Sequence, residues 1–291
     1  MSQINVDIIQ PFTPGTDVVD VNGVRVLGSI STSSIQVSSS YSATTSQDSV
    51  LIGFGAAPSV TGQSTVAIGK YAGLSLTTGY TNVLVGQSAG QNMSVGLGNT
   101  LIGHNSGTQV NGSGNVALGS SSAVLLTTGS SNTFIGSQTG SGVGPISGGF
   151  NTVIGYGANP STGTVYNEFT LGSSSVATLR CAVTSITSLS DARDKKEVED
   201  LNVGLEFIDG LRPVKFVWDD RDENGKHDIA DFGFIAQDLK AAEEAVEMAD
   251  ILKLVYDENP EKLEASYGKL IPVLVKAVQE LSAEVKELKS K

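Results

Sequence analysis

An apolar phrase that ends in glycine recurs along residues 49–176. The glycine returns eight times, at intervals of 16, 17, 17, 16, 17, 19 and 17 residues. Ile, Val or Leu stands directly before it, Val, Thr or Phe three residues before it, and a small residue three positions after it. Apolar positions two residues apart share one face of a β-strand, so the pattern predicts one short strand per repeat. The eight glycines are Gly53, Gly69, Gly86, Gly103, Gly119, Gly136, Gly155 and Gly172.

Turn-forming residues separate these predicted strands. Asn stands four residues before the glycine in five of the eight repeats. Glycine suits a strand end that needs a positive φ or a close approach of two backbones, and Asn opens turns and can stack on its copies in neighbouring repeats. One strand and its turn cannot bury their own apolar face, but a stack of such units or several chains can. We therefore predict a mainly β shaft over residues 49–176, built as a single-chain β-roll or as an intertwined β-prism.

The segments on either side of the repeats are interpreted from their position and pattern. Residues 1–48 alternate apolar and polar side chains between turn signals, which predicts short strands. We interpret them as an anchoring or capping segment that docks to another structural protein, with a simple lead-in to the repeats as the alternative. Residues 177–189 form the junction between the repeats and the C-terminal region.

The charged residues divide the chain near Ser190. Residues 1–190 hold 8 of the 48 Asp, Glu, Lys and Arg side chains, and residues 191–291 hold the other 40. A separate, helix-forming domain over residues 190–291 is the expected result. The net charge of −12 leaves no basic face for phosphates, so no nucleic-acid partner is expected.

Further expectations concern the membrane and the single cysteine. No apolar run reaches 18 residues and the first residues lack a basic leader, so we expect neither a membrane span nor a secretion signal. Cys181 is the single cysteine, and we expect it to be a small buried apolar residue.

The repeat region lacks the residues of an enzyme. Glycan-cleaving fibres use paired carboxylates, but Glu168 is the one acidic residue between positions 49 and 189. His104 follows a glycine, and we interpret it as a polar surface residue of a turn. We expect no cofactor and no metal, and a shaft that serves binding or spacing.

Four segments of the C-terminal region occur together in a recognisable order. They are SDARDKKEVEDL, LEFIDGLRPVKFVW, DFGFIAQDL and YGKLIPVLVKAVQELSAEVKEL. Residues 190–291 thereby resemble the intramolecular chaperone and auto-processing domain at the C-terminus of endosialidase-type phage tailspikes and fibres. The resemblance implies an α+β domain that ends in a helical coiled-coil bundle, assembles three chains and then cuts itself off.

The resemblance also implies a self-cleaving dyad, a Ser followed five residues later by a Lys. Ser190 and Lys195 match these positions, Asp191 matches the acid after the Ser, and Asp194 departs from the apolar residue usual before the Lys. The dyad needs a neutral amine, and Lys196 is the alternative base. Attack of Ser190 on the carbonyl of Leu189 passes through a five-membered ring, so we favour cleavage at Leu189–Ser190 over Ser190–Asp191.

The last 25 residues carry a heptad pattern. β-Branched residues at one core position with Leu at the other favour dimers in simple coiled coils. Leu270, Val275 and Ala277 widen the stripe, however, and the resemblance implies three chains. Pro272 requires the helix to begin near it or to kink. The expected trimerisation residues are Tyr267, Ile271, Leu274, Val278, Leu281, Val285 and Leu288.

Together these features predict a homotrimeric phage virion fibre, such as a tail fibre, made in the host cytoplasm. Its expected partners are itself, another virion protein bound through residues 1–48, and a host surface receptor that is a glycan or a protein. The one activity expected is a single self-cleavage without an external substrate. The alternatives are a trimeric cell-surface adhesin or non-viral structural repeat protein with the same chaperone, and a glycan depolymerase tailspike.

Overall fold

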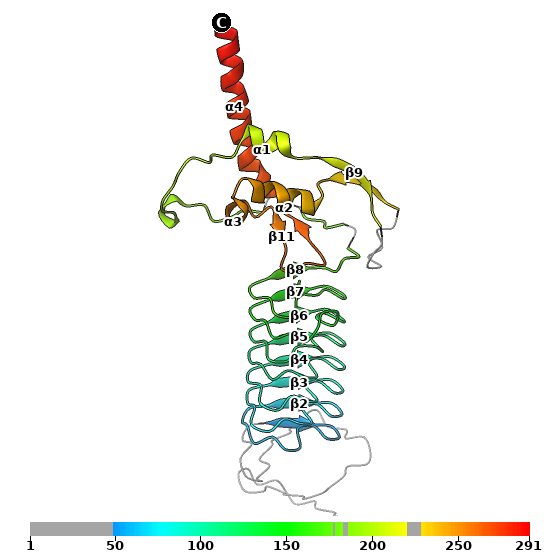
Figure 1. The fold of residues 1–291 in the computed structure, drawn as a ribbon. Coiled ribbons are helices and arrows are strands. Elements are labelled where there is room, and N and C mark those ends of the chain that lie inside the picture. Colours follow the sequence, from blue (N-terminus) through cyan, green and yellow to red (C-terminus); the bar gives the residue numbers. More distant parts are fainter. Residues whose placement is uncertain (1–48, 177, 183–185, 220–227) are drawn as a thin grey trace, which may run out of the picture. The chain divides into compact units, whose positions relative to one another are not determined.

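A computed structural model describes residues 49–176, 178–182, 186–219 and 228–291. The expected anchoring segment, residues 1–48, lies outside the described residues. Residues 49–176 form a parallel β-solenoid in which each coil contributes one three-residue strand to a single sheet (Figure 1). The strands are β1 Val50–Ile52, β2 Val66–Ile68, β3 Val83–Val85, β4 Thr100–Ile102, β5 Val116–Leu118, β6 Thr133–Ile135, β7 Thr152–Ile154 and β8 Phe169–Leu171.

Each strand pairs with the strand of the next coil, in register. Leu84 of β3, for example, lies beside Leu101 of β4, which lies beside Ala117 of β5. Because all neighbours in the sheet come from consecutive coils of one chain, the shaft is a single-chain β-roll, which decides between the two predicted architectures. Consecutive coils rise by about 4.8 Å, the usual spacing between paired strands.

The core of the solenoid is filled by inward-facing side chains from several positions of each coil. The middle residue of each strand from β2 to β7 is buried, as are the small residue three positions after most of the glycines and a larger residue farther along the coil. Phe134, Met93 and Leu126 are among the largest buried side chains. The first and third residues of each strand point the other way and are mostly half-buried or exposed.

The recurring glycines hold strand ends that no other residue fits. Gly103 has a φ of 135°, outside the range that side chains favour, and a Cβ placed on it would overlap the carbonyl oxygen of Gly119 in the next coil. At Gly69 the corresponding distance, from the added Cβ to the carbonyl oxygen of Gly86, would be 2.5 Å. Both expected reasons for glycine, a positive φ and a close backbone approach, are therefore confirmed.

A ladder of buried asparagines runs through the coils beside the strands. In each step the backbone N–H of one Asn donates to the Oδ1 of the Asn in the preceding coil, at 2.9–3.0 Å. The side-chain amide donates to a carbonyl of the following turn, as Asn115 does to Gly129 at 3.0 Å. The predicted stacking of Asn on Asn is confirmed. The ladder consists of Asn82, Asn99, Asn115, Asn132 and Asn151.

Glu168 ends this ladder in the last coil. Its backbone N–H donates to Asn151 Oδ1 at 2.9 Å, and its Oε1 accepts hydrogen bonds from Ser161 N and Thr170 Oγ1. Partial burial raises the pKa of this carboxyl, but the hydrogen bonds from Ser161 and Thr170 outweigh it and hold the pKa below its usual value.

The C-terminal region combines short helices, two small antiparallel sheets and one long helix. Its first element is a 3₁₀ turn, η1 Ala192–Asp194. A second 3₁₀ turn, η2 Tyr267–Lys269, leads into the long helix at the C-terminus. The remaining elements are α1 Leu205–Gly210, β9 Val214–Val217, β10 Ala230–Gly233, α2 Ala236–Ala245, α3 Ala249–Leu252, β11 Val255–Tyr256, β12 Glu264–Ala265 and α4 Leu270–Ser290.

One face of the first half of α4 packs into the core of this region. Leu270, Val273 and Ala277 are buried, and Leu270 and Val273 join a cluster with Phe207 of α1 and Leu239 of α2. The N-cap of helix α1 is Gly204, which has no side chain to cap the helix. Glu280 Oε2 instead accepts a hydrogen bond from the first backbone N–H of the helix, that of Leu205, at 2.7 Å. The start of α4 at Leu270 places Pro272 in the first turn, where proline is tolerated, as its position required.

Some sequence expectations differ from the structure. Cys181 is exposed, not buried, because the junction on which it lies has no core to enter. Leu270 and Ala277 bury against the chain's own domain and do not widen the exposed stripe of the helix. In the described part of the chain, no helix is long and apolar enough to span a membrane.

Candidate self-cleavage site

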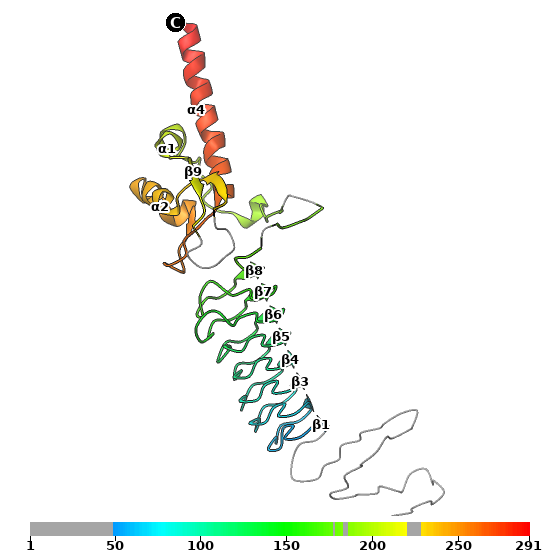
Figure 2. The ribbon, with the colours of Figure 1, turned by 90° about the vertical axis from the view of Figure 1, so that its right-hand side faces the viewer.

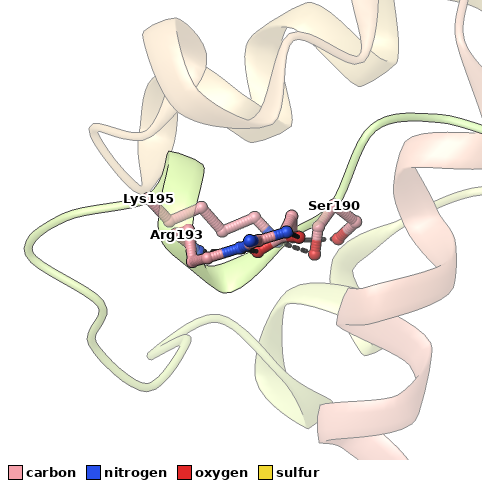
Figure 3. Close-up of polar contacts among 4 residues, drawn as sticks. Ser190, Arg193 and Lys195 are labelled. Atoms are coloured by element: carbon pink, nitrogen blue, oxygen red, sulfur yellow. Dashed lines mark hydrogen bonds and ion pairs between the residues drawn. The ribbon is translucent and has the colours of Figure 1, made fainter.

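The structure brings Ser190 and Lys195 together across the turn η1. Ser190 precedes this turn and Lys195 follows it, so the chain reverses and the two side chains meet. Lys195 Nζ lies 2.6 Å from Ser190 Oγ and 3.2 Å from the carbonyl oxygen of Ser190 (Figure 3). A spacing of five residues thus places an amine within hydrogen-bond reach of a hydroxyl, as nucleophile activation requires.

Asp191 and Arg193 hold the turn in this shape. Asp191 Oδ1 accepts from the backbone N–H of Arg193 at 2.9 Å and so caps the 3₁₀ turn. The Arg193 guanidinium also pairs with the same carboxylate, with Nη2 2.6 Å from Asp191 Oδ2. These hydrogen bonds hold the pKa of Asp191 below its usual value. Asp191, the acidic residue after Ser190, therefore binds Arg193. The sequence spacing alone did not indicate this contact.

The site is open to water in the single chain. Leu189 is 98% exposed, and Ser190, Asp191 and Lys195 are exposed as well. Both bonds considered for cleavage, Leu189–Ser190 and Ser190–Asp191, therefore lie on the surface. These contacts therefore provide the geometry of a dyad without the burial that removes water from around the amine.

The expected trimerisation residues of α4 form an exposed seam. Ile271, Leu274, Val278, Leu281, Val285 and Leu288 are between 39% and 70% exposed. At 3.6 residues per turn they form a stripe of α4 directly beside the one that holds the buried Leu270, Val273 and Ala277. We call these six residues the α4 seam.

Tyr267 is placed differently from the α4 seam. It lies in η2, before the helix begins, and its ring packs edge-on against Phe234. Its hydroxyl oxygen accepts a hydrogen bond from the backbone N–H of Phe234 at 3.1 Å, while the side chain remains 47% exposed. Tyr267 thus contacts Phe234 of its own chain with one part of its side chain and leaves the other part exposed.

Comparison with known families bears on residues 190–249. They match the family model described as the chaperone of endosialidase, and the match begins at Ser190. The comparisons with curated proteins and with solved structures gave no match. The matched stretch holds the Ser190–Lys195 pair and the elements η1 to α2, while α4 lies beyond it. The resemblance seen in the sequence is thus confirmed over residues 190–249, the part of the C-terminal region that matches the chaperone of endosialidase.

Proposed function

We propose that this chain is a phage virion fibre protein that assembles as a homotrimer and then releases its chaperone domain by self-cleavage at Leu189–Ser190. An endosialidase-type chaperone domain joined to a β-solenoid shaft fits a phage fibre or a tailspike-like protein. The observation that carries the proposal is the 2.6 Å contact between Lys195 Nζ and Ser190 Oγ at the boundary of the matched domain.

The proposed cleavage chemistry combines the contact between Lys195 and Ser190 with the five-membered ring through which Ser190 Oγ can reach the carbonyl of Leu189. A neutral Lys195 amine takes the proton of Ser190 Oγ while that oxygen attacks the carbonyl carbon of Leu189. The tetrahedral intermediate collapses with loss of the peptide nitrogen, which takes up a proton and becomes the free amine of Ser190. This leaves an ester between Leu189 and Ser190 Oγ. Water then hydrolyses the ester, which yields a carboxylate on Leu189 and restores the hydroxyl.

Assembly supplies what the single chain lacks. The dyad is exposed and so is the α4 seam, and association of three chains buries apolar surface. Removal of water from around Lys195 favours its neutral form. Cleavage then occurs after trimerisation and does not precede it. Once the chaperone domain has left, an unfolded fibre cannot refold with its help. Unfolding is then irreversible, and the rate of unfolding sets the stability of the fibre.

The other partners are assigned from the position of each segment. Residues 1–48 dock the fibre to another virion protein. The shaft faces the host, where its Ser, Thr, Asn and Gln side chains bind a glycan or protein receptor or act as a spacer. Affinity then arises from many weak polar contacts repeated over three chains.

Mass spectrometry of the purified full-length product tests this function. We expect fragments of residues 1–189 and 190–291 without added protease, and an intact chain from Ser190→Ala and from Lys195→Ala. Lys196→Ala is the matched control and should cleave normally. Complete cleavage of both dyad variants would exclude the dyad, and a C-terminal fragment that begins at Asp191 would move the cut by one bond.

A further inference from the structure

The outer face of the shaft sheet carries a continuous strip of mainly apolar, β-branched and aliphatic side chains. The first and third residues of every strand point away from the solenoid core, and in-register pairing aligns them in two rows along the coils. Figure 2 shows the strands gathered along one side of the coil stack and the turns along the other. The first row is Val50, Val66, Val83, Thr100, Val116, Thr133, Thr152 and Phe169, and the second is Ile52, Ile68, Val85, Ile102, Leu118, Ile135, Ile154 and Leu171. We call these sixteen residues the outer strip.

This strip departs from what a solvent-facing strand normally shows. A sheet with one wet face alternates apolar residues toward the core with polar residues toward water, whereas strands buried on both faces are uninterrupted apolar runs. Strands such as VAI, VLV and VAL are uninterrupted, although Ile52 is 44% exposed and Leu118 45% exposed in the single chain. Exposed aromatics such as Tyr80 and Phe150 occur in single coils, whereas the strip recurs in every coil.

The size of the strip suits one part of a larger contact. Seven steps of about 4.8 Å give a length of roughly 34 Å, and a three-residue strand is about 10 Å wide. The footprint is roughly 340 Å² per chain, less than half of the roughly 800 Å² that each partner of a standard interface buries, so the strip needs a further contact such as the α4 seam.

The strip can face copies of itself because it carries no charge, in a shaft whose residues 49–176 include two charged side chains, Lys70 and Glu168. When identical copies meet about an axis, each residue faces its own equivalents, so any charged side chain there would repel itself. None of the sixteen residues of the outer strip is charged. The same chain carries a second unpartnered apolar surface, the α4 seam, on a domain of the endosialidase-chaperone type.

We propose that the outer strip is the surface along which three copies of this chain pack coil by coil, with their sheets facing a common axis. This inference rests on the proposed trimer and adds to it the part of the shaft that forms the contact. The shaft core is then complete within each chain, and Val, Ile, Leu, Thr and Phe side chains form the contacts between chains.

Site-specific cross-linking of the full chain tests the proposal. In a Cys181→Ser, Ser190→Ala background, Leu118→Cys places one thiol on the strip and leaves the chaperone attached. The control, Gln109→Cys, places it on a turn of the neighbouring coil, away from the strip. A short bis-maleimide spans facing sheets, which lie about 10 Å apart. We expect Leu118→Cys, but not Gln109→Cys, to give a cross-linked pair of chains on a denaturing gel.

Light scattering on the same samples separates this inference from the proposed function. A trimer mass together with cross-linking at Leu118 supports both. A trimer mass without cross-linking at Leu118, or with equal cross-linking at Gln109, overturns the strip as the interface and leaves the trimer standing. A monomer mass overturns the proposed trimer and this inference together. Circular dichroism of both variants confirms that the shaft is folded.

Discussion

Substitution of Asn115 by Ala tests the asparagine ladder at the middle of the shaft. Asn115 is fully buried, and its Nδ2 donates to Asn99 Oδ1 and to the carbonyl of Gly129, both at 3.0 Å. Its Oδ1 accepts from the backbone N–H of Asn132 at 2.9 Å. Alanine removes these bonds and leaves the Gly129 carbonyl and the Asn132 N–H buried without their partners. A solenoid coil contacts its two neighbours and little else, so the defect lies where each coil depends on the next.

The expected loss is set by those two groups. A buried donor or acceptor left unpaired costs about 1–3 kcal/mol, so two of them cost about 2–6 kcal/mol. We expect Asn115→Ala to lower the unfolding midpoint of the shaft well beyond the effect of Asn92→Ala. Asn92 is an exposed residue of a turn, where substitutions usually change stability by less than about 0.5 kcal/mol.

Denaturant unfolding measured by circular dichroism compares both variants. Asn115→Asp adds a second comparison, because it keeps the size of the side chain but sets a carboxylate oxygen against the Gly129 carbonyl. Burial raises the pKa of such an Asp, so its cost should shrink as the pH falls. Midpoints for Asn115→Ala and Asn92→Ala that agree within error would refute the structural role of the ladder.

Two further predictions concern the strand ends and the last coil. Gly103→Ala should destabilise the shaft by more than about 1 kcal/mol, because φ is 135° and the next coil's backbone occupies the Cβ position, whereas His104→Ser beside it should not; equal melting temperatures would contradict this. The lowered pKa of Glu168, where hydrogen bonds from Ser161 and Thr170 outweigh burial, makes its stabilisation present above its unfolded pKa of about 4.3 and lost as the pH falls through the folded pKa. Glu168→Gln should flatten this acid dependence in hydrogen exchange of the last coil, and an unchanged pH profile would exclude the effect.

The repeat was predictable because its cause is local. Each glycine must relieve the same steric conflict in every coil, so the period appears directly in the sequence. Which side chains of each strand face the core was not predictable, because three apolar residues in a row show no alternation of apolar and polar positions. The structure shows that the middle position, occupied by residues as different as Ala67 and Phe134, faces the core.

Turn residues show a second limit of sequence reasoning. The sequence around Ser121, in a turn between two strands, gives no reason against valine at this position. Its φ of 54° does, because a β-branched side chain is strained in that region. Several other non-glycine residues of the turns, such as Tyr71, adopt the same conformation without a residue type that signals it.

The pairing of Ser190 with Lys195 was expected from the family resemblance, and the turn η1 explains its spacing, but the surroundings of the pair were not predictable. Five residues bridged by a capped 3₁₀ turn bring Lys195 to Ser190 whatever surrounds them. Desolvation of the amine depends on surfaces that meet only when chains associate, and a single sequence carries no direct signal for it. The heptad pattern of α4 was recognisable because its apolar residues recur every three or four positions. Leu270, Val273 and Ala277 pack on the chain's own core, and the α4 seam is left for partners.

If three outer strips do face one axis, the regularity of the shaft creates a problem of register. A slip of one chain by one coil, about 4.8 Å, sets Val or Thr against Val or Thr in the first row, and Ile, Leu or Val against one another in the second, at almost every height. The largest irregularity that marks the correct alignment is the interval of 19 residues between Gly136 and Gly155, and it affects a single coil. The free-energy difference between registers is therefore small compared with the whole interface. A separate device must fix the alignment before the strips meet, and the α4 seam, whose positions occur once per chain, is suited to that task.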